Sequence, residues 1–236
     1  MLPQISTPSF FTKLPSSGQE IEYRPFLVKE EKILLMAIEG GDSKEIMNAV
    51  LKIVGDCVKT EIDADKISTF DVEYLFLKLR GKSVGEVIEL TLTHPQGECQ
   101  AKTKVALNLD DIQVQGVVTD GKIMITDEVG VKMRYPNLTD MDRIQKALEN
   151  DNTGSTFDII AMCVEYIFDN EDVYNDYTKN DLEEWLGNLN QSQFKKISDF
   201  FSSAPKLRHE LNWQCNSCGE KETLVLEGLE SFFTLA

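Results

Sequence analysis

The segment VIELTLTHPQGECQAKTKVALNL (residues 87–109) decides the fold class, because apolar and polar residues alternate along it. Alternation with a period of two is typical of β-strands that bury one face. The sequence His-Pro-Gln-Gly at residues 94–97 separates a run at 89–92 from a run at 102–105 and has the composition of a turn. We therefore expect an antiparallel hairpin in the middle of the chain.

On the N-terminal side of this hairpin, a first hairpin and three helices are expected. Residues 10–14 and 21–23 flank the turn sequence Pro-Ser-Ser-Gly, which predicts the hairpin. Helical spacing follows in three segments: residues 29–39, ended by two glycines; a segment capped by Ser43 and reaching Cys57; and a segment after Thr69. We interpret Arg80–Ser83 as the turn that ends the third helix.

On the C-terminal side, strands give way to a second helical block. Short strands fit residues 122–126 and 130–135. Helices are expected at residues 140–149, 157–168, 179–189 and 191–201, the last two capped by Thr178 and Asn190. Residues 207–213 and 223–226 then bracket a turn and form a closing hairpin.

These patterns predict an α+β fold in four segments. They are an N-terminal hairpin plus helices (residues 1–81), a central antiparallel β region (82–136), a helical region (137–205), and a C-terminal β-hairpin with an apolar tail (206–236). The 236 residues fit either two small domains or one composite domain.

Charge and hydropathy narrow the classes of partner. The chain carries 24 basic and 40 acidic side chains, a net charge of −16, which opposes attraction to phosphate backbones and anionic lipids. No apolar run approaches the roughly 20 residues that span a bilayer, and the N-terminus lacks the pattern of a signal peptide. We expect neither nucleic-acid binding nor membrane insertion.

The best local motif is Cys215-x-x-Cys218-Gly219 in the turn of the closing hairpin. Five cysteines in a chain without a signal peptide favour reduced thiols or metal ligands over disulfides. Two thiolates at this spacing supply half of a tetrahedral Zn²⁺ site. His94 and Cys99, at the tip of the central hairpin, are the candidate second half, and His209 competes as the fourth ligand. The alternative interpretation is a reduced surface turn without metal.

Catalytic patterns are missing from the sequence. Neither His94 nor His209 lies in a turn typical of a nucleophile-and-base pair. Cys57 and Cys163 lie among apolar residues and are expected to be buried as small hydrophobic groups. The turn at residues 80–83 lacks the preceding glycine of a phosphate-binding loop. We expect a protein that is not an enzyme.

Several segments together resemble the baseplate hub subunits of T-even-type contractile-tailed bacteriophages. They are residues 22–32 (EYRPFLVKEEK), 70–85 (FDVEYLFLKLRGKSVG), 131–136 (VKMRYP), 206–209 (KLRH) and 226–233 (LEGLESFF). The resemblance implies a virion protein of the tail baseplate, made in the cytoplasm of the infected bacterium. It also implies contacts with other hub and tail-tube-initiating proteins, in a homo- or hetero-oligomer.

Two groups of residues in these segments are candidate interface residues. Arginine is favoured at interfaces for its planar, paired hydrogen bonding, which singles out Arg24, Arg80 and Arg134; salt bridges within the chain are the alternative. The apolar residues near the C-terminus either dock on the chain's own core or insert into a neighbouring subunit. They are Leu229, Phe232 and Phe233.

The leading hypothesis is a structural or assembly component of the baseplate hub that acts through protein contacts. A zinc-ribbon-type adaptor in phage gene expression is the first alternative, motivated by the Cys-x-x-Cys turn and opposed by the acidic charge. A cell-wall hydrolase of the tail is the second alternative, because a glycosidase that uses only carboxylates has no signature in one sequence.

Overall fold

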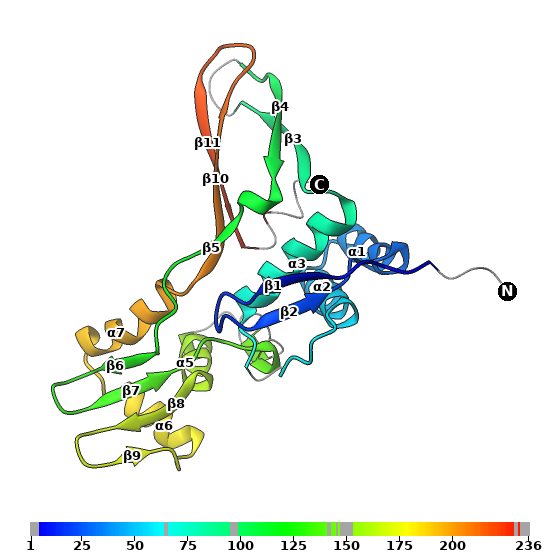
Figure 1. Ribbon diagram of the computed structural model, residues 1–236. Helices are drawn as coiled ribbons and strands as arrows, with labels where there is room; N and C mark the ends of the chain where they lie inside the picture. The colour runs from blue at the N-terminus through cyan, green and yellow to red at the C-terminus, as the bar shows by residue number, and fades with distance from the viewer. Residues whose placement is uncertain are drawn as a thin grey trace. The chain divides into compact units, whose positions relative to one another are not determined.

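The fold mixes helices with antiparallel sheets. The computed structural model describes residues 5–63, 66–94, 99–140, 143, 144, 146, 153–228 and 231 (Figure 1). Every strand pair in this part of the chain is antiparallel, so the predicted α+β class is confirmed.

The chain groups into two compact units by its internal contacts. The first unit contains residues 1–61, 70–115 and 206–236, and the second contains residues 62–69 and 116–205. The division into four segments made from the sequence stays a prediction. Each unit is described below by itself.

The first unit begins with the predicted hairpin and helices. Strands β1 (Phe10–Lys13) and β2 (Glu20–Tyr23) pair in register, and the helices α1 (Val28–Gly40) and α2 (Ser43–Cys57) follow. The N-cap of α2 is Asp42 instead of the expected Ser43, because the Asp42 carboxylate accepts a hydrogen bond from the Lys44 N–H at 2.8 Å.

Helix α3 (Thr69–Val84) is longer than expected. The interpretation of Arg80–Ser83 as a turn is wrong, because these residues continue the helix. The Ser83 hydroxyl donates to the Leu79 carbonyl and accepts from the Phe26 N–H, so it fits within the last turn. Gly85, with φ of 132°, follows the helix and adopts a backbone conformation that favours glycine.

Two long hairpins complete the first unit, and their strands lie side by side (Figure 1). The central hairpin is β3 (Val87–Thr93) with β4 (Lys102–Asn108), in the register Leu90↔Val105. Residues 95–98 of its predicted turn lie outside the described residues. The closing hairpin is β10 (Lys206–Gln214) with β11 (Lys221–Glu227).

The closing hairpin pairs with a strand from the middle of the chain. Strand β10 also pairs with the short strand β5 (Gln113–Gln115), which the sequence did not predict and which follows the 3-10 turn η1 (Leu109–Asp111). Both hairpins and α3 contribute to one apolar core. Its buried members are Leu77, Leu90, Leu107, Leu109, Ile112, Leu207, Leu211 and Leu226.

The second unit contains a four-stranded sheet in the order β6-β7-β8-β9. The strands are β6 (Lys122–Met124), β7 (Gly130–Met133), β8 (Val164–Phe168) and β9 (Val173–Tyr174). The helices are η2 (Leu138–Asp140), α5 (Thr153–Met162), α6 (Lys179–Gly187) and α7 (Gln191–Ser202). Most of the helix expected at residues 140–149 lies outside the described residues.

The helix expected at residues 157–168 is wrong in its second half. Helix α5 ends at Met162, and residues 164–168 pair with β7 as strand β8. Residues 164–168 form a strand because Val164 and Ile167 pack against neighbours in the sheet and core, where β-branched side chains pack well. The expected caps are confirmed: Thr178 begins α6 and Asn190 begins α7.

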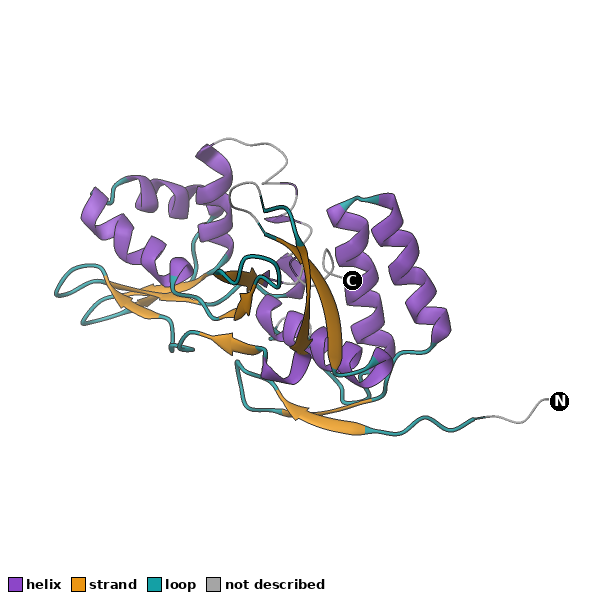
Figure 2. Ribbon diagram, turned by 90° about the horizontal axis from the view of Figure 1, so that it is seen from above, coloured by secondary structure: helices purple, strands orange, loops and turns teal. Residues whose placement is uncertain are grey.

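Helices of the second unit cover one side of its sheet (Figure 2). The core between them is made by Val131, Met133 and Val164 from the sheet and by Leu186 and Phe200 from α6 and α7. The ring of Tyr135 stacks on that of Phe200, with centroids 4.7 Å apart. Among the described residues, no helix combines the length and the apolar character needed to cross a bilayer.

A pair of Gly→Ala substitutions tests this backbone description. Gly121 has φ of +73°, and an added Cβ would lie 2.0 Å from the Met133 carbonyl oxygen. We expect Gly121→Ala to lower the free energy of unfolding by about 2 kcal/mol or more. Gly55 lies within α2 with open space around it, so Gly55→Ala should raise stability by about 0.5–1 kcal/mol.

Urea and thermal unfolding of both variants measure the difference. A Gly121→Ala variant as stable as Gly55→Ala would contradict the described close approach between β7 and residue 121.

Candidate metal centre

The tips of the two long hairpins meet. His94 follows β3 and Cys99 precedes β4, while Cys215 and Cys218 lie in the turn between β10 and β11. The Asn216 N–H donates to the Thr103 hydroxyl at 3.2 Å, which joins the closing hairpin to β4. Residues more than 100 positions apart are thereby neighbours.

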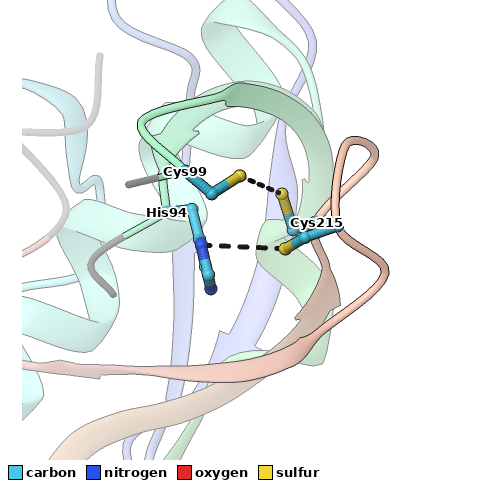
Figure 3. A group of neighbouring side chains, drawn as sticks. His94, Cys99 and Cys215 are labelled. Atoms are coloured by element: carbon cyan, nitrogen blue, oxygen red, sulfur yellow. Dashed lines mark hydrogen bonds between the residues drawn. The ribbon is translucent and has the colours of Figure 1, made fainter. Parts of the chain in front are cut away.

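Four metal-ligand side chains converge at this point, and we call them the tip cluster: His94, Cys99, Cys215 and Cys218. Their donor atoms all lie within 4.8 Å of one another. The Sγ atoms of Cys99 and Cys215 are 3.8 Å apart, and Cys218 Sγ is 3.8 Å from His94 Nδ1. Figure 3 shows His94 and Cys99 on one hairpin facing Cys215 on the other.

The turn that carries Cys215 and Cys218 is closed by backbone hydrogen bonds. The Cys215 N–H donates to the Glu220 carbonyl at 2.8 Å, and the Gly219 N–H donates to the Cys215 carbonyl at 2.9 Å. Gly219 has φ of 77°, a conformation that glycine adopts without steric cost. The glycine after the Cys-x-x-Cys motif thus lets the turn present both thiols on one side.

His94 is buried and held from its far side. Its side chain is 1% exposed, and its Nε2 lies 3.2 Å from Glu222 Oε1 and 3.2 Å from Glu220 Oε2. The imidazole meets the ring of Trp213 edge-on, with centroids 6.4 Å apart. These contacts orient Nδ1 toward the thiols, because Nε2 is occupied by the carboxylates.

Backbone amides favour a thiolate at Cys215. Hydrogen bonds from the Cys218 and Ser217 N–H groups lower the pKa of the Cys215 thiol to about 6. The Ala101 N–H lowers the pKa of Cys99. Burial lowers the pKa of His94, but its hydrogen bond to Cys99, the negative charge of Cys215 and the hydrogen bond to Glu222 outweigh burial and raise that pKa.

The remaining cysteines and histidine are placed elsewhere. Cys57 and Cys163 are buried in the cores of the two units, and burial raises the pKa of Cys57 to about 11 and that of Cys163 to about 12. His209 lies on β10 opposite Leu226 and is outside the tip cluster. Neutral, buried thiols are poor nucleophiles and poor metal ligands.

Sequence reasoning missed the carboxylates around His94. Glu220 and Glu222 contact the imidazole, although neither was singled out. Residues two apart on a strand face the same side, so the alternation of apolar and polar residues in β11 indicates which side Glu222 faces. Recognising it required the register Trp213↔Glu222, which is set by the length of the turn.

The hydrogen-bond partners of two candidate interface arginines, Arg24 and Arg134, lie within the chain. Arg24 donates to Glu30 and to the backbone carbonyls of Pro25 and Asp56. Arg134 donates to both carboxylate oxygens of Asp140 and to the Met162 carbonyl. These are the salt bridges named above as the alternative, and contacts of the arginines with neighbouring subunits stay a prediction.

The other candidate interface residues are placed only in part. Arg80 is half-buried in α3, and burial lowers its pKa. Leu229, Phe232 and Phe233 lie outside the described residues. Their proposed insertion into a neighbouring subunit stays a prediction.

Comparison with known proteins identifies the family. The profile of the family described as T4 bacteriophage base plate protein matches residues 7–234. The chain belongs to this family. No curated protein and no solved structure matches the chain. The resemblance to phage baseplate proteins is therefore confirmed for nearly the whole chain, and family membership by itself assigns no metal ligand in the tip cluster.

The environment of Glu30 generates a pH prediction. The Glu30 side chain is 2% exposed, and it accepts hydrogen bonds from the Leu27 N–H and from Arg24. Burial raises the pKa of this carboxyl group, but the Leu27 N–H, Arg24 and Lys29 together outweigh burial and leave the pKa below the ordinary 4.5. The stabilisation is therefore present above the ordinary pKa and is lost as the pH falls below it.

We expect Glu30→Gln to reduce stability at neutral pH and to make it less dependent on pH between about 5 and 3. The measurement is urea unfolding across that range. Glu39→Gln, an exposed position near the end of the same helix, is the control. Equal pH dependence of wild type and Glu30→Gln would show that Glu30 has no lowered pKa in the folded protein.

Proposed function

We propose that the chain is a structural or assembly component of the hub of the phage tail baseplate and acts through protein contacts. The observation that carries the proposal is the family match over residues 7–234. Family membership makes the chain a baseplate protein of the virion tail. The narrower assignment to the hub is supported by the segments at residues 22–32, 70–85 and 226–233, which resemble hub subunits.

The architecture suits a component that presents fixed surfaces to neighbours. Each unit has its own apolar core, and hydrogen bonds tie surface segments to these cores. In the first unit, the Ser16 N–H bonds to Asp71 and the Phe26 N–H bonds to Ser83, so the N-terminal segment is held on α3. Fixed surfaces reduce the conformational entropy that assembly removes.

Helix α1 offers an apolar surface for such contacts. Val28, Leu35 and Met36 are 79%, 52% and 62% exposed, and Val28 and Leu35 lie two turns apart on one side of the helix. A pocket of about 440 Å³, lined in part by Met36 and Ala37, lies against α2. Exposed apolar groups that gather on one surface are typical of interfaces, and in a baseplate protein the occupant we propose is a neighbouring baseplate subunit.

The direct test is to locate the chain in the particle and in its precursors. Hub complexes, complete baseplates and mature virions are purified from infected cells, and peptides of the chain are quantified by mass spectrometry. Constant stoichiometry in all three identifies a permanent hub component, and presence only in the precursors identifies an assembly factor. Absence from all three would contradict the proposal.

The alternatives from the sequence make different predictions. A cell-wall hydrolase releases soluble fragments from purified peptidoglycan, whereas we expect the purified chain to release none. A zinc-ribbon adaptor co-purifies with a component of gene expression, whereas we expect co-purification with tail proteins. The net charge of −16 opposes direct contact of an adaptor with nucleic acid.

Substitutions on α1 test the proposed contact surface. Leu35→Asp and Met36→Asp place a charge where the proposed contact is apolar, so we expect incorporation of the chain into baseplates to fall at least tenfold when the partner must desolvate that charge. Both side chains are exposed, and the midpoint of thermal unfolding should change little.

Lys32→Asp is the matched control, because Lys32 is exposed on the same helix and receives the same new side chain. Wild-type incorporation of both α1 variants, or equal loss in the control, would count against the apolar surface as the site of contact.

A further inference from the structure

We propose that the tip cluster binds one Zn²⁺ ion as a closed structural site that fastens the two long hairpins together. The inference concerns the stability of the first unit and does not depend on the hub assignment. Two donors come from each hairpin: His94 and Cys99 from the central one, and Cys215 and Cys218 from the closing one.

The distances fit a single tetrahedral ion. Two sulfurs bound to Zn²⁺ at about 2.3 Å in a tetrahedron lie about 3.8 Å apart. The Sγ atoms of Cys99 and Cys215 are separated by 3.8 Å, as are Cys218 Sγ and His94 Nδ1. A disulfide requires about 2.05 Å between sulfurs, and so the arrangement matches ligands around an ion better than a bonded pair.

The donor set selects the class of metal. Thiolates and imidazole are soft or borderline ligands that favour Zn²⁺, whereas Mg²⁺ and Ca²⁺ take oxygen ligands. Three thiols and one imidazole complete four-fold coordination, which leaves no position for water or substrate. The site therefore has a structural role and performs no catalysis.

The surroundings prepare the ligands for the ion. Backbone N–H groups of Ser217 and Cys218 point at the Cys215 sulfur and stabilise its negative charge. On the other side, Glu220 and Glu222 contact His94 Nε2 at 3.2 Å. A carboxylate on the far nitrogen fixes the tautomer and orientation of a metal-bound imidazole, so Nδ1 is the coordinating atom of His94.

The ion adds a link between the tips, which lie beyond the leucine core that the two hairpins share. The core that the hairpins share is built from Leu90, Leu107, Leu211 and Leu226, which lie along the strands below the tips. Near the tips, the buried side chains among the described residues include the polar His94 and Thr103 beside Trp213 and Cys215. A two-stranded hairpin is marginally stable alone, and metal binding adds directly to folding free energy.

The first experiment measures zinc in the full chain. The protein is purified under reducing conditions without chelator, and metal content is determined by inductively coupled plasma mass spectrometry. We expect one zinc per chain, and X-ray absorption at the zinc edge should show three sulfurs and one nitrogen. Protein that contains no zinc and gains none from added Zn²⁺, or zinc held by oxygen ligands, would overturn the proposal.

Variants assign the ligands. Cys215→Ser, Cys218→Ser and His94→Asn should lose stoichiometric zinc, and Glu222→Ala should weaken zinc binding about 10- to 100-fold as an outer partner. The controls keep the same chemistry outside the cluster: Cys57→Ala, Cys163→Ala and His209→Asn should retain zinc. Loss of zinc in His209→Asn with retention in His94→Asn would overturn the ligand set.

A spectroscopic measurement covers variants that fail to fold. Wild-type protein is loaded with Co²⁺ in place of Zn²⁺, and tetrahedral thiolate coordination should give a sulfur-to-cobalt charge-transfer band together with intense d–d bands. A mercurial reagent should then release the metal as three thiols react. A spectrum of six-coordinate Co²⁺ with oxygen ligands would contradict the proposal without any substitution.

Discussion

The pairing of β5 with β10 is the constraint on which the rest of the first unit depends. Its register, Lys206↔Gln115 and Arg208↔Gln113, joins two strands that lie on either side of residues 116–205, the larger segment of the second unit. Closing so long a loop costs conformational entropy. Burial of Ile112 and Leu207, both fully enclosed in the shared core, offsets that cost. Only with its base fixed in this way does the closing hairpin bring Cys215 and Cys218 to the tip of the central hairpin.

Local signals in the sequence were sufficient for the hairpins and for most helices. Alternation at residues 87–109 predicted β3 and β4, and the caps Thr178 and Asn190 predicted the starts of α6 and α7. These local signals did not predict two strands, β5 and β8. Strand β5 has three residues, too few for periodicity, and it exists because β10 pairs with it. The pattern at residues 157–168 fits an amphipathic helix over its whole length, and only pairing with strand β7 shows that its second half is the strand β8.

The tip cluster was accessible from the sequence because its candidate ligands are chemically distinctive and lie in or beside turns. The Cys-x-x-Cys-Gly spacing marked one half and the His94 to Cys99 turn marked the other. The sequence left His94 and His209 as competing candidates because both lie on or beside a hairpin strand, and the structure places His94 beside the thiols. The partners of the arginines, in contrast, could not be predicted from the sequence. This sequence contains forty carboxylates, and each is an equal candidate to pair with Arg24 or Arg134. Only the folded backbone shows that Glu30 and Asp140 are the partners.

The proposed function combines the family assignment with the two compact units, each built around its own apolar core. A baseplate component must keep its surfaces in place while neighbours assemble on it, and the zinc site that we propose between the two hairpin tips would serve that purpose. The most direct test is a cryo-EM map of purified hub complexes and baseplates at side-chain resolution. We predict this chain beside the start of the tail tube, with density for an ion between the two hairpin tips. A hub whose density is fully explained by other proteins, in both preparations, would contradict it.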